Sequence, residues 1–174
     1  MILVVAGVAG SGKTTIGRLM AARLHCEFAD GDAFHSAANV AKMEAGIPLT
    51  DADRWPWLES IVAWMDERAA AGESAVVACS ALRRAYRTVL LSGSAGARMV
   101  FLVVPQGDDE ARLAHRPGHF FPQALLQSQF AALELPEQSE GVPLVPAAGT
   151  PEQTADRVME ALGLQPGRTD TPSA

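Results

Sequence analysis

A segment near the start of the chain has the residue types and the spacing of a phosphate-binding loop. Residues 7–14, GVAGSGKT, match G-x-x-x-x-G-K-[ST] at every fixed position. The glycines let successive backbone N–H groups turn toward phosphate oxygens, and Lys13 adds a positive charge that reaches the β- and γ-phosphates. We expect ATP to bind here, with Lys13 in a catalytic role. The predicted nucleotide-binding residues are Gly7, Ala9, Gly10, Ser11, Gly12, Lys13, Thr14 and Thr15.

Two carboxylates follow the next apolar run. Asp30 and Asp32 are two residues apart in an extended segment, so their side chains point roughly the same way. We assign Asp30, together with the Thr14 hydroxyl, to Mg²⁺, which prefers oxygen ligands. Asp32 is assigned to the acceptor hydroxyl, as its base or orienting group. The alternative is an Asp-Gly turn whose acids are simply solvated.

The elements that must position these residues alternate between strand and helix. Short apolar runs predict strands at residues 2–6, 26–29, 75–79, 98–104 and 142–145. Helical spacing predicts helices at 13–24, 37–45, 84–91, 108–115, 123–133 and 152–162, and a capping-box pair, Thr50 and Asp53, begins another. This order predicts an α/β fold with a five-stranded, mostly parallel sheet and helices on both faces, and the phosphate loop makes it a P-loop fold. Ligands then bind beyond the carboxyl ends of the strands.

Length and composition narrow the class of protein. The 174 residues, 48% of them hydrophobic, predict one domain over residues 1–164, followed by a disordered tail at 165–174. A net charge of −6 argues against nucleic-acid or anionic-membrane partners. The sequence shows no signal peptide, membrane span, disulfide framework or zinc pattern, so we expect a cytoplasmic protein.

Other classes of P-loop protein fit less well. A motor ATPase usually has an apolar strand that ends in an acid, but the run at 75–79 is followed by Ser80. The base-reading N-K-x-D segment of a GTPase is absent. A small chain with these features is typical of a metabolite kinase.

Four blocks of residues resemble the gluconokinase family, short P-loop carbohydrate kinases that make 6-phosphogluconate. They are the phosphate loop at 7–14; Asp30-Gly31-Asp32, His35, Asn39, Lys42-Met43, Gly46, Pro48-Leu49, Asp51, Asp53-Arg54 and Pro56-Trp57-Leu58; Cys79-Ser80-Ala81-Leu82-Arg83 with Tyr86-Arg87; and Gly118-His119-Phe120, Leu125-Leu126, Ser128-Gln129-Phe130, Leu133-Glu134 and Pro136. The likeness covers residues 2 to about 136. It implies that ATP and Mg²⁺ serve the phosphorylation of D-gluconate at its 6-hydroxyl. Members of the family are often dimers, so the resemblance leaves a homodimer open.

D-gluconate carries one carboxylate and five hydroxyls, so its site needs cations and polar groups. Arg83 and Arg87 are four residues apart, on one face if the stretch is helical, and one or both could hold the carboxylate bidentately. His35 and Arg54 are further acceptor candidates, although each could instead be structural. The predicted substrate-binding residues are Asp32, His35, Arg54, Arg83, Arg87, His119 and Gln129.

The predicted lid spans about residues 112–122. Arg112 and Arg116 are four residues apart and would close over the γ-phosphate, where cations stabilise the transferring group. We therefore expect both to be catalytic. Closure would also exclude water.

The sequence departs from the family pattern in one loop, and two alternative functions stay open. After the last strand the family often has an aspartate where this chain reads VPAAGT at 145–150, which predicts looser selectivity for the base. Shikimate kinases have a glycine triplet where this chain has Ser80-Ala81-Leu82-Arg83, which favours gluconate. A kinase for another small hydroxy acid and a non-catalytic nucleotide-binding regulator are the competing hypotheses.

Overall fold

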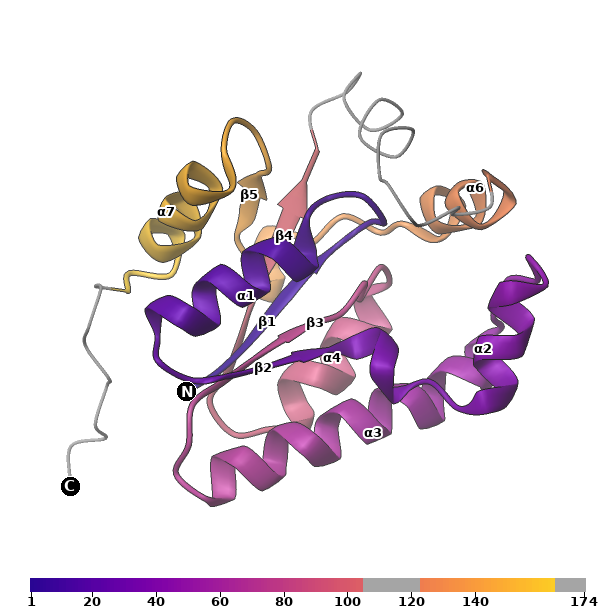
Figure 1. Ribbon diagram of the computed structural model, residues 1–174, viewed down its shortest axis with the longest axis horizontal. Coiled ribbons are helices and arrows are strands. Elements are labelled where there is room, and N and C mark those ends of the chain that lie inside the picture. Colours follow the sequence, from indigo (N-terminus) through magenta and orange to yellow (C-terminus); the bar gives the residue numbers. More distant parts are fainter. Residues whose placement is uncertain (105–122, 165–174) are drawn as a thin grey trace.

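The centre of the molecule is a five-stranded parallel sheet (Figure 1). The computed structural model describes residues 1–104 and 123–164. The strands are β1 (Ile2–Gly7), β2 (Glu27–Asp30), β3 (Ala75–Ala78), β4 (Ala97–Val103) and β5 (Leu144–Pro146). Their order in the sheet is β2-β3-β1-β4-β5, and every neighbouring pair is parallel. The predicted parallel α/β sheet is confirmed.

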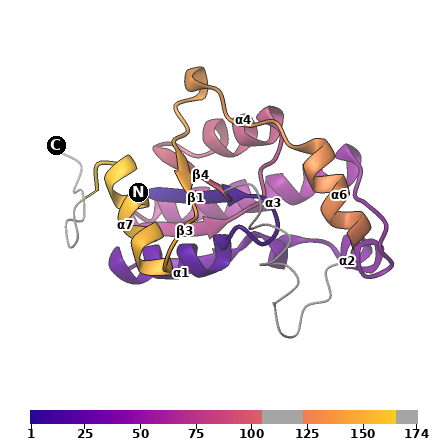
Figure 2. The same ribbon diagram turned by 90° about the horizontal axis from the view of Figure 1, so that it is seen from above.

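Helices cover both faces of this sheet (Figure 2). Helices α1 (Lys13–Arg23) and α7 (Pro151–Ala161) pack on one face, and α3 (Asp51–Ala70) and α4 (Arg84–Gly93) on the other. The side chains of β1 alternate between the two faces, so that Val4 joins the α3 side and Val5 the α1 side. Both are fully buried, as is Ile61 of α3, and each such side chain contributes about 1.5–3 kcal/mol.

Side-chain caps fix where several helices begin. The predicted capping box of α3 is present, because Thr50 accepts a hydrogen bond from the Asp53 N–H while Asp53 accepts one from the Thr50 N–H. Thr150 and Gln153 form the equivalent box at α7. The remaining helical elements are η1 (Gly31–Phe34), α2 (Ala37–Glu44), α6 (Gln123–Ala132) and η2 (Gln138–Glu140).

The last strand begins later than predicted. We expected it at 142–145, but β5 starts at Leu144, which pairs with Phe101. Pro143 has no N–H to donate to the ladder, although its carbonyl still accepts from the Phe101 N–H at 2.9 Å. Val142 instead packs into the core on the α3 side.

Three predictions lie outside the described residues. They are the helix at 108–115, the lid at 112–122 and the tail at 165–174. Within the described ranges, no helix is both long and apolar enough to cross a membrane. Cys79 is buried in the core, and burial raises the pKa of its thiol to about 12.

Candidate active site

The phosphate loop joins the end of β1 to the start of α1. Gly10 and Gly12 have φ values of 80° and 89°, in the left-handed region that favours glycine. At Gly7, with φ of 143°, an added Cβ would lie 2.7 Å from both the Leu102 carbonyl oxygen and the Ser11 Oγ. The fixed glycines of the motif are therefore required by backbone geometry and close packing.

A cavity of about 240 Å³ lies on one side of this loop. Gly10, Gly12 and Thr15 line it from the phosphate-loop side, and Ala147, Gly149 and Thr154 line it from the segment that follows β5. A nucleotide with its phosphates at the start of α1 would thus have its base and ribose beside the loop after the last strand. The Lys13 Nζ donates to the Val8 carbonyl at 2.8 Å, which keeps the ammonium on the loop.

Asp30 links the phosphate loop to the end of β2. The Thr14 Oγ1 donates to the Asp30 Oδ2 at 2.9 Å, and the Asp30 Oδ1 accepts from the Asp32 N–H at 3.2 Å. Gly31 is needed between them, because an added Cβ would clash with the Ala78 carbonyl on β3. The hydroxyl and carboxylate predicted for Mg²⁺ are therefore adjacent, and both supply the hard oxygen donors that this ion prefers. No cluster of three or more His, Cys, Asp or Glu side chains suited to a metal occurs among the described residues.

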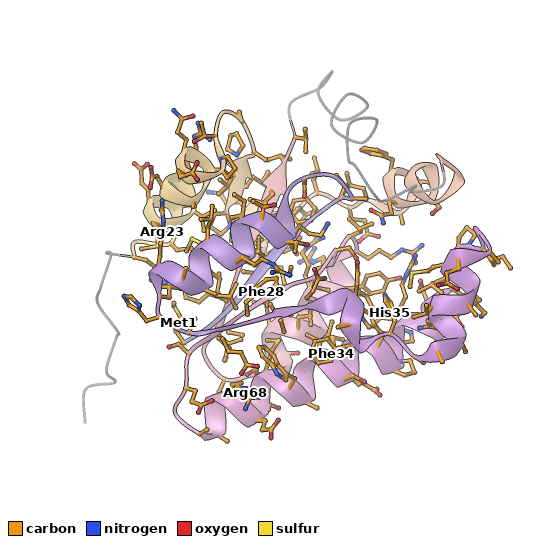
Figure 3. The ribbon with its side chains drawn as sticks, viewed as in Figure 1. Met1, Arg23, Phe28, Phe34, His35 and Arg68 are labelled. Carbon is orange, nitrogen blue, oxygen red and sulfur yellow. The ribbon has the colours of Figure 1, made fainter. Side chains whose placement is uncertain are left out.

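The acceptor side is built on Trp57 of α3. Its indole N–H donates to the Gly31 carbonyl at 2.7 Å, and the His35 ring stacks on it with centroids 4.4 Å apart (His35 is labelled in Figure 3). Burial lowers the pKa of His35; nearby Asp32 opposes this and Arg54 adds to it. A neutral imidazole can both donate and accept hydrogen bonds, which suits a sugar hydroxyl.

Arg54, Arg83 and Tyr86 gather around Asp51, which begins α3. The Arg83 Nη1 lies 2.7 Å from the Asp51 Oδ2, and the Tyr86 hydroxyl donates to the Asp51 Oδ1 at 2.5 Å. The Arg54 Nη1 donates to the Tyr86 hydroxyl at 3.1 Å and lies 3.9 Å from Asp51. The structure thus brings together Arg54 and Arg83, which were predicted from different blocks of sequence.

Arg87 requires a correction, because it does not share the environment of Arg83. It is 1% exposed, and its Nε and Nη2 donate to the two carboxylate oxygens of Glu140 at 2.7 and 2.9 Å. Its Nη1 donates to the carbonyls of Ala81, Leu82 and Glu134. Every nitrogen of this guanidinium is engaged inside the protein, so we assign Arg87 to bracing the loop after β3 and not to binding substrate.

Gln129 of α6 contacts the phosphate loop itself. Its Oε1 accepts a hydrogen bond from the Ala9 N–H at 2.8 Å, across 120 residues of sequence. The resemblance listed Gln129 among the substrate-binding residues, and the contact that the structure gives it is with the phosphate loop. Arg112, Arg116 and His119 lie outside the described residues.

Sequence reasoning gave Asp51 only a possible pairing with Arg54 and gave Tyr86 no role, although both stand in the motif blocks. Tyr86 lies three residues after Arg83 in the same block, and this short separation is the signal that could have linked the two. The Glu140 partner of Arg87 had no recognisable signal, because it lies 53 residues away in an irregular segment.

A parallel sheet with a glycine-rich phosphate loop, a hydroxyl–carboxylate pair and a cationic acceptor site defines a P-loop kinase. A family model described as an AAA domain matches residues 2–136. The gluconokinase of Gluconobacter oxydans (strain 621H) is 46% identical over 160 residues, which cover 92% of this chain and 88% of that protein. The chain belongs to the gluconokinase family.

Solved structures agree with this assignment. A gluconokinase from Sinorhizobium meliloti 1021 superposes with a TM-score of 0.82 at 41% identity, covering 92% of this chain and 90% of that one. An unliganded sugar kinase from Janibacter sp. HTCC2649 gives 0.87 at 47% identity, with 95% of each chain covered. A shikimate kinase from Bacteroides thetaiotaomicron gives 0.62 at 22% identity, covering 94% of this chain and 99% of that one, and so shares the fold alone.

Proposed function

We propose that this chain transfers the γ-phosphoryl group of ATP to the 6-hydroxyl of D-gluconate, giving ADP and 6-phospho-D-gluconate. The proposal rests on the phosphate loop and the candidate acceptor residues lying at the same edge of the sheet. In a chain 46% identical to a gluconokinase, the phosphate loop, Asp32 and Arg83 follow the carboxyl ends of the neighbouring strands β1, β2 and β3, and Arg54 of α3 lies with Arg83 around Asp51. Such an edge can hold a triphosphate and an anionic polyol side by side.

On the nucleotide side, the backbone N–H groups at residues 12–15, at the N-terminus of α1, hold the phosphates. The Lys13 ammonium leaves the Val8 carbonyl and neutralises charge on the β- and γ-phosphates. The cavity beside Ala147 and Gly149 receives the base. Backbone groups of that segment read adenine, since it has no acidic side chain at 145–150.

Thr14 and Asp30 would hold Mg²⁺, since their oxygens already lie 2.9 Å apart at the mouth of the loop. When bound there, the ion neutralises phosphate charge and orients the β- and γ-phosphates. Asp30 also accepts the Asp32 N–H, so the same carboxylate fixes the backbone that carries the acceptor group.

On the acceptor side, Asp32 accepts the proton of the gluconate 6-hydroxyl. The bond from that oxygen to the γ-phosphorus forms as the bond between the γ-phosphorus and its bridging oxygen breaks, and ADP leaves with the bridging oxygen. Arg83 and Arg54 bind the carboxylate at the other end of the acceptor, and His35 hydrogen-bonds a hydroxyl between them. Arg112 and Arg116 complete the site as lid cations, with His119 on the underside of the lid.

Positioning supplies most of the catalysis in this scheme. Holding an alcohol oxygen in line with phosphorus converts a bimolecular step into an effectively unimolecular one. The rival hypotheses, a shikimate-type kinase and a non-catalytic regulator, have no comparable support, because shikimate kinases share only the fold at 22% identity.

A coupled assay of ADP release tests the proposal directly. With ATP and Mg²⁺, D-gluconate should stimulate release and shikimate should not, and phosphorus NMR should identify 6-phospho-D-gluconate. Asp32→Asn should lower kcat by about 10²- to 10⁴-fold while ATP affinity, measured by calorimetry, stays within about twofold. Asp66→Asn, an equal charge change at an exposed position of α3, is the matched control. Turnover of shikimate in place of gluconate would overturn the proposal.

A further inference from the structure

Asp51 contacts Arg83 and Tyr86 in the way that a bound carboxylate ligand could. One of its oxygens accepts from Arg83 at 2.7 Å and the other from Tyr86 at 2.5 Å, a bidentate arrangement like that of a bound carboxylate ligand. Its side chain is 42% exposed and that of Arg83 is 38% exposed. This contact is therefore open to solvent and to competing anions.

The cations around Asp51 need a counter-charge. The guanidinium carbons of Arg54 and Arg83 lie 5.7 and 5.9 Å from the centre of the same Tyr86 ring. Two like charges on one ring repel, and a carboxylate between them relieves the repulsion. Burial raises the pKa of Tyr86, as does its hydrogen bond to Asp51, so the phenol stays protonated and donates.

Arg54 and Arg83 each have more N–H donors than these contacts use. Among the described residues, the Arg83 guanidinium donates to Asp51 and the Arg54 guanidinium donates to Tyr86. Each guanidinium has five N–H donors, so each can donate further hydrogen bonds. A second carboxylate can therefore be received by the same pair of side chains.

We propose that Asp51 is a specificity-determining residue, a built-in carboxylate that occupies the binding edge of Arg83 until an acidic acceptor displaces it. The inference rests on the proposed function, since it takes the acceptor to be a sugar acid. An acid that also engages Asp32 and His35 through its hydroxyls gains enough to displace Asp51. A simple monocarboxylate makes the arginine contact alone and does not.

Selectivity then comes from competition within the protein. With Asp51 in place, the cluster of Asp51, Arg54 and Arg83 has a net charge of +1, and without it the charge rises to +2. Removing the carboxylate should strengthen the binding of every small carboxylate. Simple monocarboxylates, which wild type excludes because they make the arginine contact alone, should then bind as well.

The test compares Asp51→Asn and Asp51→Ala with wild type and with Asp66→Asn. Asp66 is exposed on the same helix, 15 residues further on, or about 22 Å along its axis. L-lactate, a monocarboxylate with one hydroxyl, serves as the probe, first as an inhibitor of D-gluconate phosphorylation and then in calorimetric titration. In both Asp51 variants we expect the inhibition constant of lactate to fall about tenfold and the KM for gluconate to fall as well. Asp66→Asn should stay within about twofold of wild type.

An unchanged or weaker affinity for lactate, in variants whose thermal midpoints match wild type, would overturn the inference and make Asp51 a positioning residue for Arg83. Unfolding of both variants would also overturn it, because a displaceable, half-exposed carboxylate contributes little to stability. If wild type does not phosphorylate gluconate, the proposed function fails. The lactate titration then still reports whether Asp51 competes with other carboxylates for Arg83.

Discussion

Arg83 and Arg87 come from the same helix start, yet their surroundings differ completely. Arg87 is 1% exposed and donates from all three of its nitrogens to Glu140 and to three carbonyls. Arg83 is 38% exposed, and within the described part of the chain its guanidinium donates to Asp51. The first guanidinium is part of the folded scaffold, and the second has donors to offer a ligand. The role of an arginine in a sequence motif can thus be judged from how many of its N–H donors already bind other groups of the protein.

The scaffold supported by Arg87 is the loop that presents Arg83. Ala81 in this loop has φ of 43°, a left-handed conformation that is costly for a residue with a Cβ. Arg87 binds the carbonyls of Ala81 and Leu82, and the Leu82 carbonyl also accepts from the Glu134 N–H at 2.9 Å. The segment after α6 therefore holds a strained turn in place. One arginine positions the other.

The largest expected effect follows from breaking the buried pair. Arg87→Met leaves Glu140, whose side chain is 7% exposed, without its counter-charge, and should lower the free energy of unfolding by about 3–5 kcal/mol. Urea denaturation measures this change. Arg84→Met, which removes an exposed pair with Glu137, is the control and should cost at most about 1 kcal/mol. A stable Arg87→Met protein with a raised KM for gluconate would reverse the assignment of the two arginines.

In contrast to Arg87→Met, Arg83→Ala should weaken substrate binding and leave stability nearly unchanged. It removes charge-assisted hydrogen bonds to the substrate carboxylate, each about 1.5–3 kcal/mol, so kcat/KM for gluconate should fall about 10- to 100-fold. The KM for ATP and the urea midpoint should hardly change. Steady-state kinetics against each substrate checks the prediction, and a loss confined to the KM for ATP would contradict it.

The smallest effect is a pH dependence of stability. The hydrogen bonds from Arg87 hold the pKa of Glu140 below its ordinary value, so its contribution to stability is fully present above the unfolded-state pKa of about 4.3 and is lost as pH falls through the lower folded-state value. Between pH 5 and pH 3 the unfolding free energy of wild type should therefore fall more steeply than that of Glu140→Gln. Urea titrations at several pH values measure both slopes. Parallel curves would show that the pair does not act in this way.

The sequence predicted what depends on local pattern. The five strands, the phosphate loop and the capping box at Thr50 follow from short-range spacing, and the structure has them. Arg83 and Arg87 failed as a pair because Arg83 is the N-cap of α4, with extended backbone at φ −99° and ψ 147°, so the four-residue rule of a helix face does not reach it. The contacts Arg87–Glu140 and Gln129–Ala9 span 53 and 120 residues, and only the packed fold brings them together.

Recognition of an acid by the open arginine cluster is the central claim, and one binding measurement tests it without turnover. D-gluconate and D-glucitol have the same carbon chain, but only gluconate has a carboxylate. In calorimetry on the wild-type protein we expect gluconate to bind at least about tenfold more tightly than glucitol, and Arg83→Ala to remove most of that difference. Equal affinities of wild type for the two polyols would contradict it.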